Sequence, residues 1–131
     1  MSSVFTRIIK GEIPCYKIAE NENYFAFLDI NPLKRGHTLV VPKIEIDKLF
    51  DLDEKTYLGL MDFSRKIALA IEKATPCNRV GMTIVGLEVP HAHVHLIPIN
   101  NVNDINFDRK KEIISDSEFL LISEGIRKFI Y

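Results

Sequence analysis

The distribution of histidine is the most informative feature of this chain. It has four histidines in 131 residues, and three of them, His91, His93 and His95, lie two positions apart. Side chains on a β-strand alternate between its two faces. A strand would therefore place the three imidazoles on one face, roughly 7 Å apart, and the intervening apolar residues on the other. A helix would scatter them around its axis, so the spacing predicts a strand.

Such a row of imidazoles fits two chemistries. In the first, two histidines at positions i and i+2 bind a metal ion, and His37 or a carboxylate completes the tetrahedron. In the second, a neutral imidazole attacks phosphorus and forms a covalent phospho-histidine intermediate. Adjacent imidazoles repel one another when charged, so at least one stays neutral and nucleophilic. Burying three unpaired imidazoles is costly, which disfavours an inert core. The spacing leaves both chemistries open.

Length and composition limit the possible classes of protein. We expect one domain over residues 1–131, because 47% hydrophobic residues supply a single core. The net charge of −1 without a basic run argues against nucleic acid as the main partner. The sequence has no stretch typical of a membrane span or a signal peptide, so we expect no membrane partner and a cytoplasmic location. Cys15 and Cys77 are expected to be free thiols.

Periodicity and capping residues predict the elements. A short helix is expected over residues 3–10 with Ser3 as its N-cap, and a long helix capped by Asp51 or Asp53 should end near residues 75–76. A capping box of Ser115 and Glu118 begins a C-terminal helix over about residues 115–130. Strands are expected at 16–20, 24–28, 37–42, 79–85 and 91–97, and a loop at 100–104. Strands grouped around one long helix favour an α+β domain with a mainly antiparallel sheet.

The residues around the triad also resemble a known family. The segment His91-Ala92-His93-Val94-His95-Leu96-Ile97 is similar to the pattern that names the histidine triad (HIT) family, and its closest likeness is to the Hint-like branch. Three earlier blocks resemble that family's N-terminal blocks in the same order. They are the residues 8–14 (IIKGEIP), 25–32 (FAFLDINP) and 36–43 (GHTLVVPK). The resemblance covers residues 4–99 and leaves the C-terminal helix outside.

The resemblance implies a fold and a reaction. The fold would be a HIT-like five-stranded antiparallel sheet with helices, commonly paired into a homodimer. The reaction would be hydrolysis or transfer of a nucleotidyl group at the α-phosphate of a purine nucleotide, without a cofactor or metal. His93 would be the nucleophile, His91 and His37 its partners in a hydrogen-bonded cluster, and His95 the contact to the phosphate.

The same resemblance assigns the nucleotide-binding residues. Asp29 matches the acidic residue that holds the ribose hydroxyls. Phe27, Leu28 and Ile30 match positions that line the base and the sugar. Backbone amides near Val89 and His91 would stabilise the charge that develops on oxygen, and Thr83 is the remaining side-chain donor in the segment before the triad.

Two departures from the family pattern concern the approach to the triad and a metal site. The polar loop before the triad is shortened, and Leu87 and Glu88 stand where phosphate-holding groups are expected. Some bacterial members bind structural zinc through two cysteines and a histidine, but the corresponding positions here carry Ser3, Thr6 and Glu45. None of these is a soft ligand, so the resemblance predicts a chain without zinc.

Three hypotheses follow. The first is a Hint-like nucleotidyl hydrolase or transferase that acts on nucleoside phosphoramidates of the AMP–amine type, with dinucleoside polyphosphate hydrolysis as a variant. The second is a nucleotide-binding module with little turnover, motivated by Leu87 and Glu88. The third is a metal-binding protein that uses the histidine row.

Overall fold

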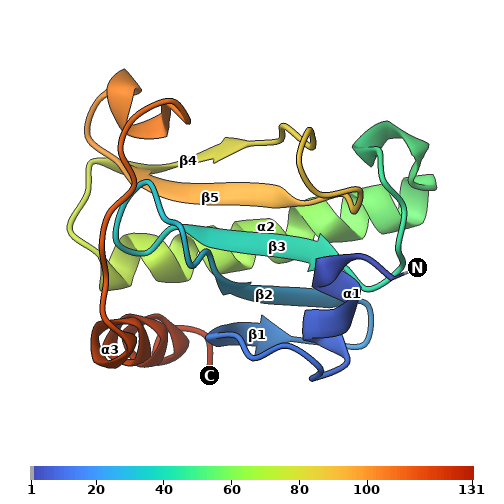
Figure 1. Ribbon diagram of the computed structural model, residues 1–131, viewed down its shortest axis with the longest axis horizontal. Coiled ribbons are helices and arrows are strands. Elements are labelled where there is room, and N and C mark those ends of the chain that lie inside the picture. Colours follow the sequence, from blue (N-terminus) through green and yellow to red (C-terminus); the bar gives the residue numbers. More distant parts are fainter. Residues whose placement is uncertain (1) are drawn as a thin grey trace.

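The computed structural model describes residues 2–131, which form a five-stranded sheet with three α-helices (Figure 1). Along the chain the elements are α1 (Val4–Ile9), β1 (Lys17–Glu20), β2 (Tyr24–Leu28), β3 (Thr38–Pro42), a 3-10 helix η1 (Leu49–Asp51), α2 (Glu54–Ala74), β4 (Arg79–Thr83), β5 (Val94–Ile99), a second 3-10 helix η2 (Val102–Ile105) and α3 (Asp116–Arg127). The expected elements are therefore present in the expected order.

The sheet has the strand order β1-β2-β3-β5-β4, and every neighbouring pair is antiparallel. The turn between β1 and β2 forms because the Asn21 side chain accepts hydrogen bonds from the backbone amides of Asn23 and Tyr24, at 3.0 and 2.9 Å. The long helix α2 connects β3 to the edge strand β4, so β5 returns between them. The prediction of an α+β fold with an antiparallel sheet is confirmed.

The two faces of the sheet bury different residues. Ala26 and Leu28 of β2 lie in the larger core, against α2 and α3, whereas Phe25 and Phe27 lie in a smaller cluster on the opposite face, against α1. This alternation follows from the two-residue period of a strand. The sheet therefore has helices on both faces, and α1 covers only part of the second face (Figure 1).

Capping residues fix the ends of the helices. The side chain of Ser3 accepts from the Thr6 amide at the start of α1, and Asp53 does the same for α2, which selects Asp53 over Asp51 as the cap. Ser115 and Glu118 form the expected capping box of α3.

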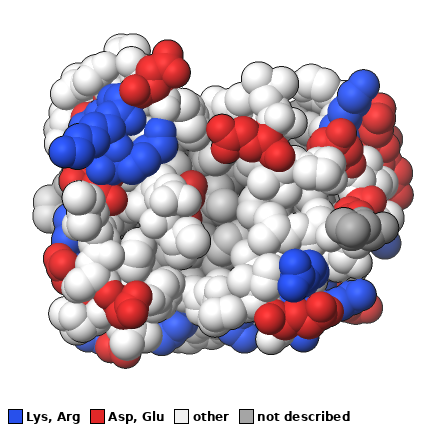
Figure 2. Space-filling view, in the orientation of Figure 1, with Lys and Arg blue, Asp and Glu red and all other residues white. Residues whose placement is uncertain are grey.

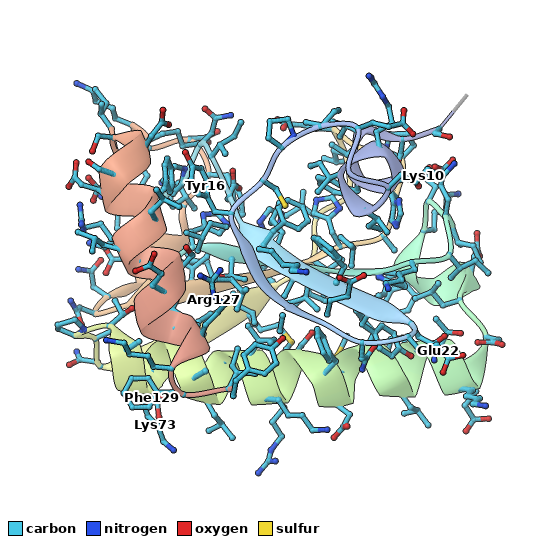
Figure 3. All side chains as sticks on the ribbon, turned by 90° about the horizontal axis from the view of Figure 1, so that it is seen from below. Lys10, Tyr16, Glu22, Lys73, Arg127 and Phe129 are labelled. Carbon is cyan, nitrogen blue, oxygen red and sulfur yellow. The ribbon has the colours of Figure 1, made fainter. Side chains whose placement is uncertain are left out.

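Helix α3 closes the β1 edge of the domain. The Tyr16 ring stacks on Phe119 with ring centroids 4.9 Å apart, and an Arg127 nitrogen donates to the Lys17 carbonyl at 2.8 Å. Figure 3 shows α3 beside α2, with Arg127 directed toward β1 and Lys73 of α2 directed away from the sheet. Within residues 2–131, none of the helices has the length and apolar character needed to cross a bilayer.

Three differences from expectation concern the segments on either side of the triad. The strand predicted at 79–85 ends at Thr83, and the loop predicted at 100–104 contains the 3-10 helix η2. The prediction of one strand over 91–97 was wrong at its start, because β5 begins at Val94. The His91 amide turns back to the Val89 carbonyl at 2.8 Å, and the Ala92 amide donates to Ile46 at 2.7 Å instead of to a strand ladder. The side chains nevertheless alternate as expected, since Ala92, Val94 and Leu96 all lie in the larger core.

Candidate active site

The four histidines gather on the face of the sheet that carries α1. His91 is fully buried, and His37, His93 and His95 are each less than a tenth exposed. Phe5 of α1 packs edge-on against His91 and His93, with ring centroids 5.8 and 4.9 Å apart. Figure 2 shows this face hollowed at its centre, between α1 and the segment that follows β5. The fold therefore places the predicted catalytic residues together under a depression of the surface.

The hydrogen bonds of His91 fix its tautomer. One ring nitrogen, Nε2, lies 2.8 Å from the Pro42 carbonyl oxygen, which can only accept, so Nε2 carries the proton. The other, Nδ1, then accepts from the Ser3 hydroxyl at 2.8 Å. Glu45 accepts from the Ser3 amide at 2.7 Å and from the Thr6 hydroxyl at 2.6 Å. We call Ser3, Thr6, Glu45 and His91 the N-terminal cluster, and it ties α1 to the triad.

His93 has the opposite tautomer. Its Nδ1 lies 2.7 Å from the His91 carbonyl oxygen, so Nδ1 carries the proton and Nε2 carries the lone pair. The backbone of His91 thus orients the ring of His93. This is the arrangement that an imidazole nucleophile needs, because a hydrogen bond at one nitrogen leaves the other free to attack.

His37 and His95 form a chain of donors that begins at the backbone. The Leu33 amide donates to His37 Nδ1 at 3.0 Å, so the proton of a neutral His37 is on Nε2. That Nε2 lies 3.0 Å from His95 Nδ1 and donates to it. His95 therefore carries its own proton on Nε2. Among the four histidines, His93 presents a lone pair and its neighbour His95 presents an N–H donor.

Burial keeps these imidazoles uncharged. It lowers the pKa of His37 to about 3 and the pKa of His95 to about 4, and neighbouring histidines add a smaller effect in the same direction. Burial also lowers the pKa values of His91 and His93, against the carbonyl hydrogen bonds that raise them. All four rings are therefore neutral at pH 7, which agrees with the tautomers that the hydrogen bonds assign.

Asp29 lies beside this chain, just after β2. Its Oδ2 is 3.5 Å from His37 Nε2, and the contact is not an ion pair because His37 is neutral and donates to His95. Burial raises the pKa of Asp29 to about 6; the Asn31 amide and the charge of Lys111 oppose this rise, and the charge of Glu88 adds to it. Asp29 is thus a carboxylate at neutral pH that is partly shielded from solvent.

The other residues predicted to bind the nucleotide do not all lie on the face of the sheet that carries the histidines. Phe27 and Val89 belong to the apolar cluster on the face that carries α1, and Ile30, the residue after Asp29, is 65% exposed. Leu28 was expected to line the nucleotide as well, and the structure contradicts this. Its side chain is 2% exposed in the larger core, because alternation along β2 turns it away from Phe27.

The segment before the triad carries Thr83 and two unexpected residues. Thr83 of β4 is the cross-strand partner of His95 and lines a cavity with His93, so it lies beside the triad. Leu87 is 89% exposed. The charge of Glu88 has the smallest of the effects on the pKa values of His93 and Asp29, and it acts upward on both, although burial lowers the pKa of His93 overall. A carboxylate at this position repels a second anionic group.

Two groups of residues lie close enough together to be considered as metal ligands. Ligand atoms of Asp29, His37 and His95 lie within 4.8 Å of one another. A metal on His37 Nε2 would require the proton on Nδ1, where it would face the Leu33 N–H. The N-terminal cluster supplies two hydroxyls that are already paired with Glu45 and His91, which does not fit the soft ligands of a zinc site. The hydrogen bonds of His37 in the first group, and the paired hydroxyls of the second, therefore do not suit a bound transition metal as they stand.

Two side chains after η2 lie beside the triad although no sequence motif pointed to them. Phe107 packs edge-on against His95, with ring centroids 4.8 Å apart, and the Lys111 ammonium donates to the Phe107 carbonyl at 2.6 Å. This segment is held to the loop after β2 by the Glu112 amide, which donates to Pro32 at 2.8 Å. It follows the part of the chain that resembles the family, so neither a motif nor a periodic pattern marked it.

Comparison with known proteins identifies the family of this chain. Residues 10–102 match the model of the HIT domain. An adenosine 5'-monophosphoramidase of Schizosaccharomyces pombe is 38% identical over 103 residues, which cover 77% of each chain. A HIT-like protein of Bartonella henselae has a similar structure, with a TM-score of 0.84 and 28% identity over 98% of this chain and 96% of that one. A zinc-bound histidine triad protein of Mycobacterium smegmatis gives 0.82 and 29% over 99% and 94%. The chain therefore belongs to the HIT domain family.

Proposed function

We propose that this protein hydrolyses or transfers nucleotidyl groups at the α-phosphate, and that its substrates are purine nucleoside phosphoramidates of the AMP–amine type. The observation that carries the proposal is the set of tautomers, which leaves His93 Nε2 as a nucleophile beside an N–H donor on His95. The similarity to a yeast adenosine 5'-monophosphoramidase supports the choice of substrate.

The reaction would proceed in two displacements. His93 Nε2 attacks the α-phosphorus, an Nε2–P bond forms, the P–N bond to the amine breaks, and the amine takes up a proton from solvent. Water then attacks the same phosphorus, a P–O bond forms, the Nε2–P bond breaks and returns the lone pair to His93, the water releases a proton to solvent, and the nucleoside monophosphate leaves. The His95 Nε2–H donates to the phosphoryl oxygen, where negative charge builds up. His37 and the Leu33 amide hold His95 in the donor tautomer.

The nucleoside would lie on the side of Asp29. Its carboxylate is suited to accept hydrogen bonds from the ribose hydroxyls, and Phe27, Ile30 and Val89 offer apolar surface to the sugar and the base. Thr83 would contact a phosphate oxygen. The site uses no cofactor or metal in this proposal, because the covalent intermediate divides the displacement into two easier steps and the N–H of His95 stabilises the charge on the phosphoryl oxygen.

The position of Glu88 favours an amine over a phosphate as the leaving group. Its carboxylate acts on both His93 and Asp29, so a leaving group with its own negative charge, as in a dinucleoside polyphosphate, would be repelled. A neutral or protonated amine would not. This is our reason for ranking phosphoramidates above the dinucleoside polyphosphates, whereas the free lone pair on His93 Nε2 is our reason for ranking an enzyme above a binding module without turnover.

The proposal extends to assembly and location. The edge strand β4 and the segment after it expose large apolar side chains, namely Met82, Ile84, Val85 and Leu87, and an open apolar edge suits pairing with a second copy. We therefore propose a homodimer. The two cysteines of the chain, Cys15 and Cys77, are free thiols, as is usual for proteins of the reducing cytoplasm, and we propose that location.

Replacement of His93 tests the proposal. The wild-type protein should hydrolyse a fluorogenic AMP phosphoramidate, and after quenching in alkaline denaturant, which preserves the acid-labile P–N bond, a nucleotidyl group should be found on the peptide that contains His93. His93→Ala should abolish both, while AMP still binds in a calorimetric titration. Hydrolysis that survives in His93→Ala would refute the mechanism, and AMP binding without any wild-type turnover would favour the binding module.

A further inference from the structure

Glu45, in the segment after β3, holds the start of α1 with a single carboxylate oxygen. Its Oε1 accepts from the Ser3 amide at 2.7 Å and from the Thr6 hydroxyl at 2.6 Å. Both donors lie at the N-terminal end of α1, and Figure 1 shows this helix beside the end of β3. Glu45 therefore ties α1 to the segment that follows β3.

The position of α1 depends on this contact. The helix has six residues, and an isolated helix of this length is not stable in water. Phe5 is the one residue of α1 that is buried, and its ring packs edge-on against His93, with ring centroids 4.9 Å apart. One apolar side chain and the polar contacts of Ser3 and Thr6 therefore hold α1 over the triad.

The Ser3 hydroxyl passes this restraint to His91. It donates to His91 Nδ1 at 2.8 Å, while the Pro42 carbonyl accepts from Nε2 at 2.8 Å. The Ile46 carbonyl accepts from the next amide, that of Ala92, at 2.7 Å. The stretch from Pro42 to Ile46 thus restrains both ring nitrogens of His91, one directly and one through Ser3, together with the backbone that follows.

We propose that Glu45 is a positioning residue of the reaction, which acts on His93 through Ser3 and His91. This inference rests on the proposed function. Without its two hydrogen bonds to Glu45, α1 would no longer be fixed, and the Ser3 hydroxyl would no longer be held at His91 Nδ1. The His91 ring could then turn, and the His91 carbonyl that orients His93 would lose its fixed place.

The contact should matter more for turnover than for stability. Glu45 is exposed, and a charge in contact with water contributes little to the stability of the whole fold. Its effect on the reaction is geometric, because a small displacement of a reacting group is costly. Asp29, on the nucleoside side, has no hydrogen bond to this cluster, so the binding of AMP should not change. We therefore expect a loss in kcat and not in KM.

Glu45→Ala and Glu45→Gln separate the hydrogen bonds from the charge. The amide oxygen of glutamine can accept both bonds, since both end on Oε1. With an AMP phosphoramidate as substrate, Glu45→Ala should lower kcat by about ten- to a hundredfold and leave KM and the affinity for AMP unchanged. Glu45→Gln should stay close to the wild type in all three.

Glu118 provides the matched control. Its Oε1 also accepts from an amide and a hydroxyl, both of Ser115, at 3.2 and 2.9 Å at the start of α3. It also pairs with Arg35, so Glu118→Ala should cost at least as much stability as Glu45→Ala. Helix α3 packs on the face of the sheet opposite to α1, so Glu118→Ala should leave kcat unchanged.

Histidine NMR separates this inference from the proposed function, because it needs no turnover. Nitrogen-15 spectra distinguish a protonated from an unprotonated ring nitrogen, and so report the tautomers of His91 and His93. We expect one tautomer at each ring in the wild type and in Glu45→Gln, and a mixture in Glu45→Ala, even if no phosphoramidate is hydrolysed.

Three results would overturn the inference. The first is a set of unchanged histidine spectra in Glu45→Ala. The second is an active wild type whose kcat Glu45→Ala leaves intact, whether or not KM rises. The third is a loss of kcat that Glu45→Gln shares with Glu45→Ala, because the charge of the carboxylate and not its hydrogen bonds would then be responsible.

Discussion

Replacement of Ser3 by alanine should damage the active site from the N-terminus of the chain. The Ser3 hydroxyl accepts from the Thr6 amide as the N-cap of α1, and it donates to Nδ1 of the buried His91. His91 in turn holds His93 through its carbonyl oxygen. One hydroxyl therefore supports both a helix end and the orientation of the proposed nucleophile.

The expected loss of stability is the sum of two effects. Removal of an N-cap serine costs about 1 kcal/mol. The buried His91 Nδ1 would also lose the hydrogen bond that it accepts from the Ser3 hydroxyl, and a buried acceptor left without a donor costs about 1–3 kcal/mol. Ser3→Ala should therefore lower the free energy of unfolding by about 2–4 kcal/mol, somewhat less if a water molecule enters.

A matched variant separates the loss of stability caused by the helix cap from the loss caused by the contact with the triad. Asp53 caps α2 in the same way, by accepting from the Thr56 amide at 2.8 Å, but it contacts no histidine. Asp53→Ala should cost only the cap, about 1 kcal/mol, and leave turnover unchanged. Urea unfolding gives the two free energies, and hydrolysis of an AMP phosphoramidate gives kcat and KM.

Ser3→Ala should lower kcat more than it raises KM, because the change disturbs the orientation of His93 and not the nucleoside side of the site. Ser3→Thr keeps a hydroxyl and should restore most of both properties. The reasoning fails if Ser3→Ala costs no more stability than Asp53→Ala and leaves kcat intact. It also fails if Ser3→Thr is as impaired as Ser3→Ala.

Three further predictions concern His37, His95 and their surroundings. With folded pKa values of about 3 and about 4, His37 and His95 bind fewer protons than in the unfolded chain below pH 6.5. The free energy of unfolding should therefore fall as the pH decreases, by up to about 1.4 kcal/mol per pH unit for each of these two histidines. Asp29, whose pKa is raised to about 6, should offset the effect of one histidine between pH 6 and pH 3.8. Equal urea midpoints at pH 7 and pH 5 would contradict this. Phe107→Ala should expose the His95 ring and move its pKa up toward 6.5, as NMR titration would show, whereas the exposed Phe50→Ala should leave it unchanged. Gly36→Ala should destabilise the protein by about 1–3 kcal/mol, because φ of Gly36 is 95° and an added Cβ would lie 3.1 Å from Thr75 and 3.2 Å from Pro98. Gly125→Ala is the control, because an added Cβ meets nothing within 4 Å on α3, and it should stabilise slightly. Thermal unfolding measures both variants.

Local signals were sufficient to predict most of the fold. Capping by Ser3 and the box at Ser115 located two helix starts, and the alternation around Val94 assigned each side chain of the triad segment to its face. These signals act over a few residues, so they survive whatever the tertiary packing does. The five-stranded antiparallel sheet came from the family resemblance, which the comparisons confirm.

Long-range contacts explain what the sequence could not predict. The start of β5 depends on Ile46, whose carbonyl takes the Ala92 amide away from the sheet. Phe107 reaches His95 only because the segment after η2 is hydrogen-bonded to the loop after β2. Leu28 was misplaced because the resemblance assigns a position along the chain to the site, whereas the pleat of β2 decides which face the side chain takes.

The break in the strand before Val94 bears directly on the proposed mechanism. A continuous strand would have presented His91, His93 and His95 as three equivalent imidazoles, which suits a metal as well as a covalent intermediate. The turn at His91 makes them different, because it directs the carbonyl of His91 to His93 Nδ1 and the ring of His91 to Ser3 and Pro42. The remaining asymmetry comes from the Leu33 amide, which sets the tautomers of His37 and His95. A single lone pair on His93 next to a single donor on His95 is thus a property of backbone groups that side-chain spacing does not reveal, and it favours the nucleophile over the metal ligand.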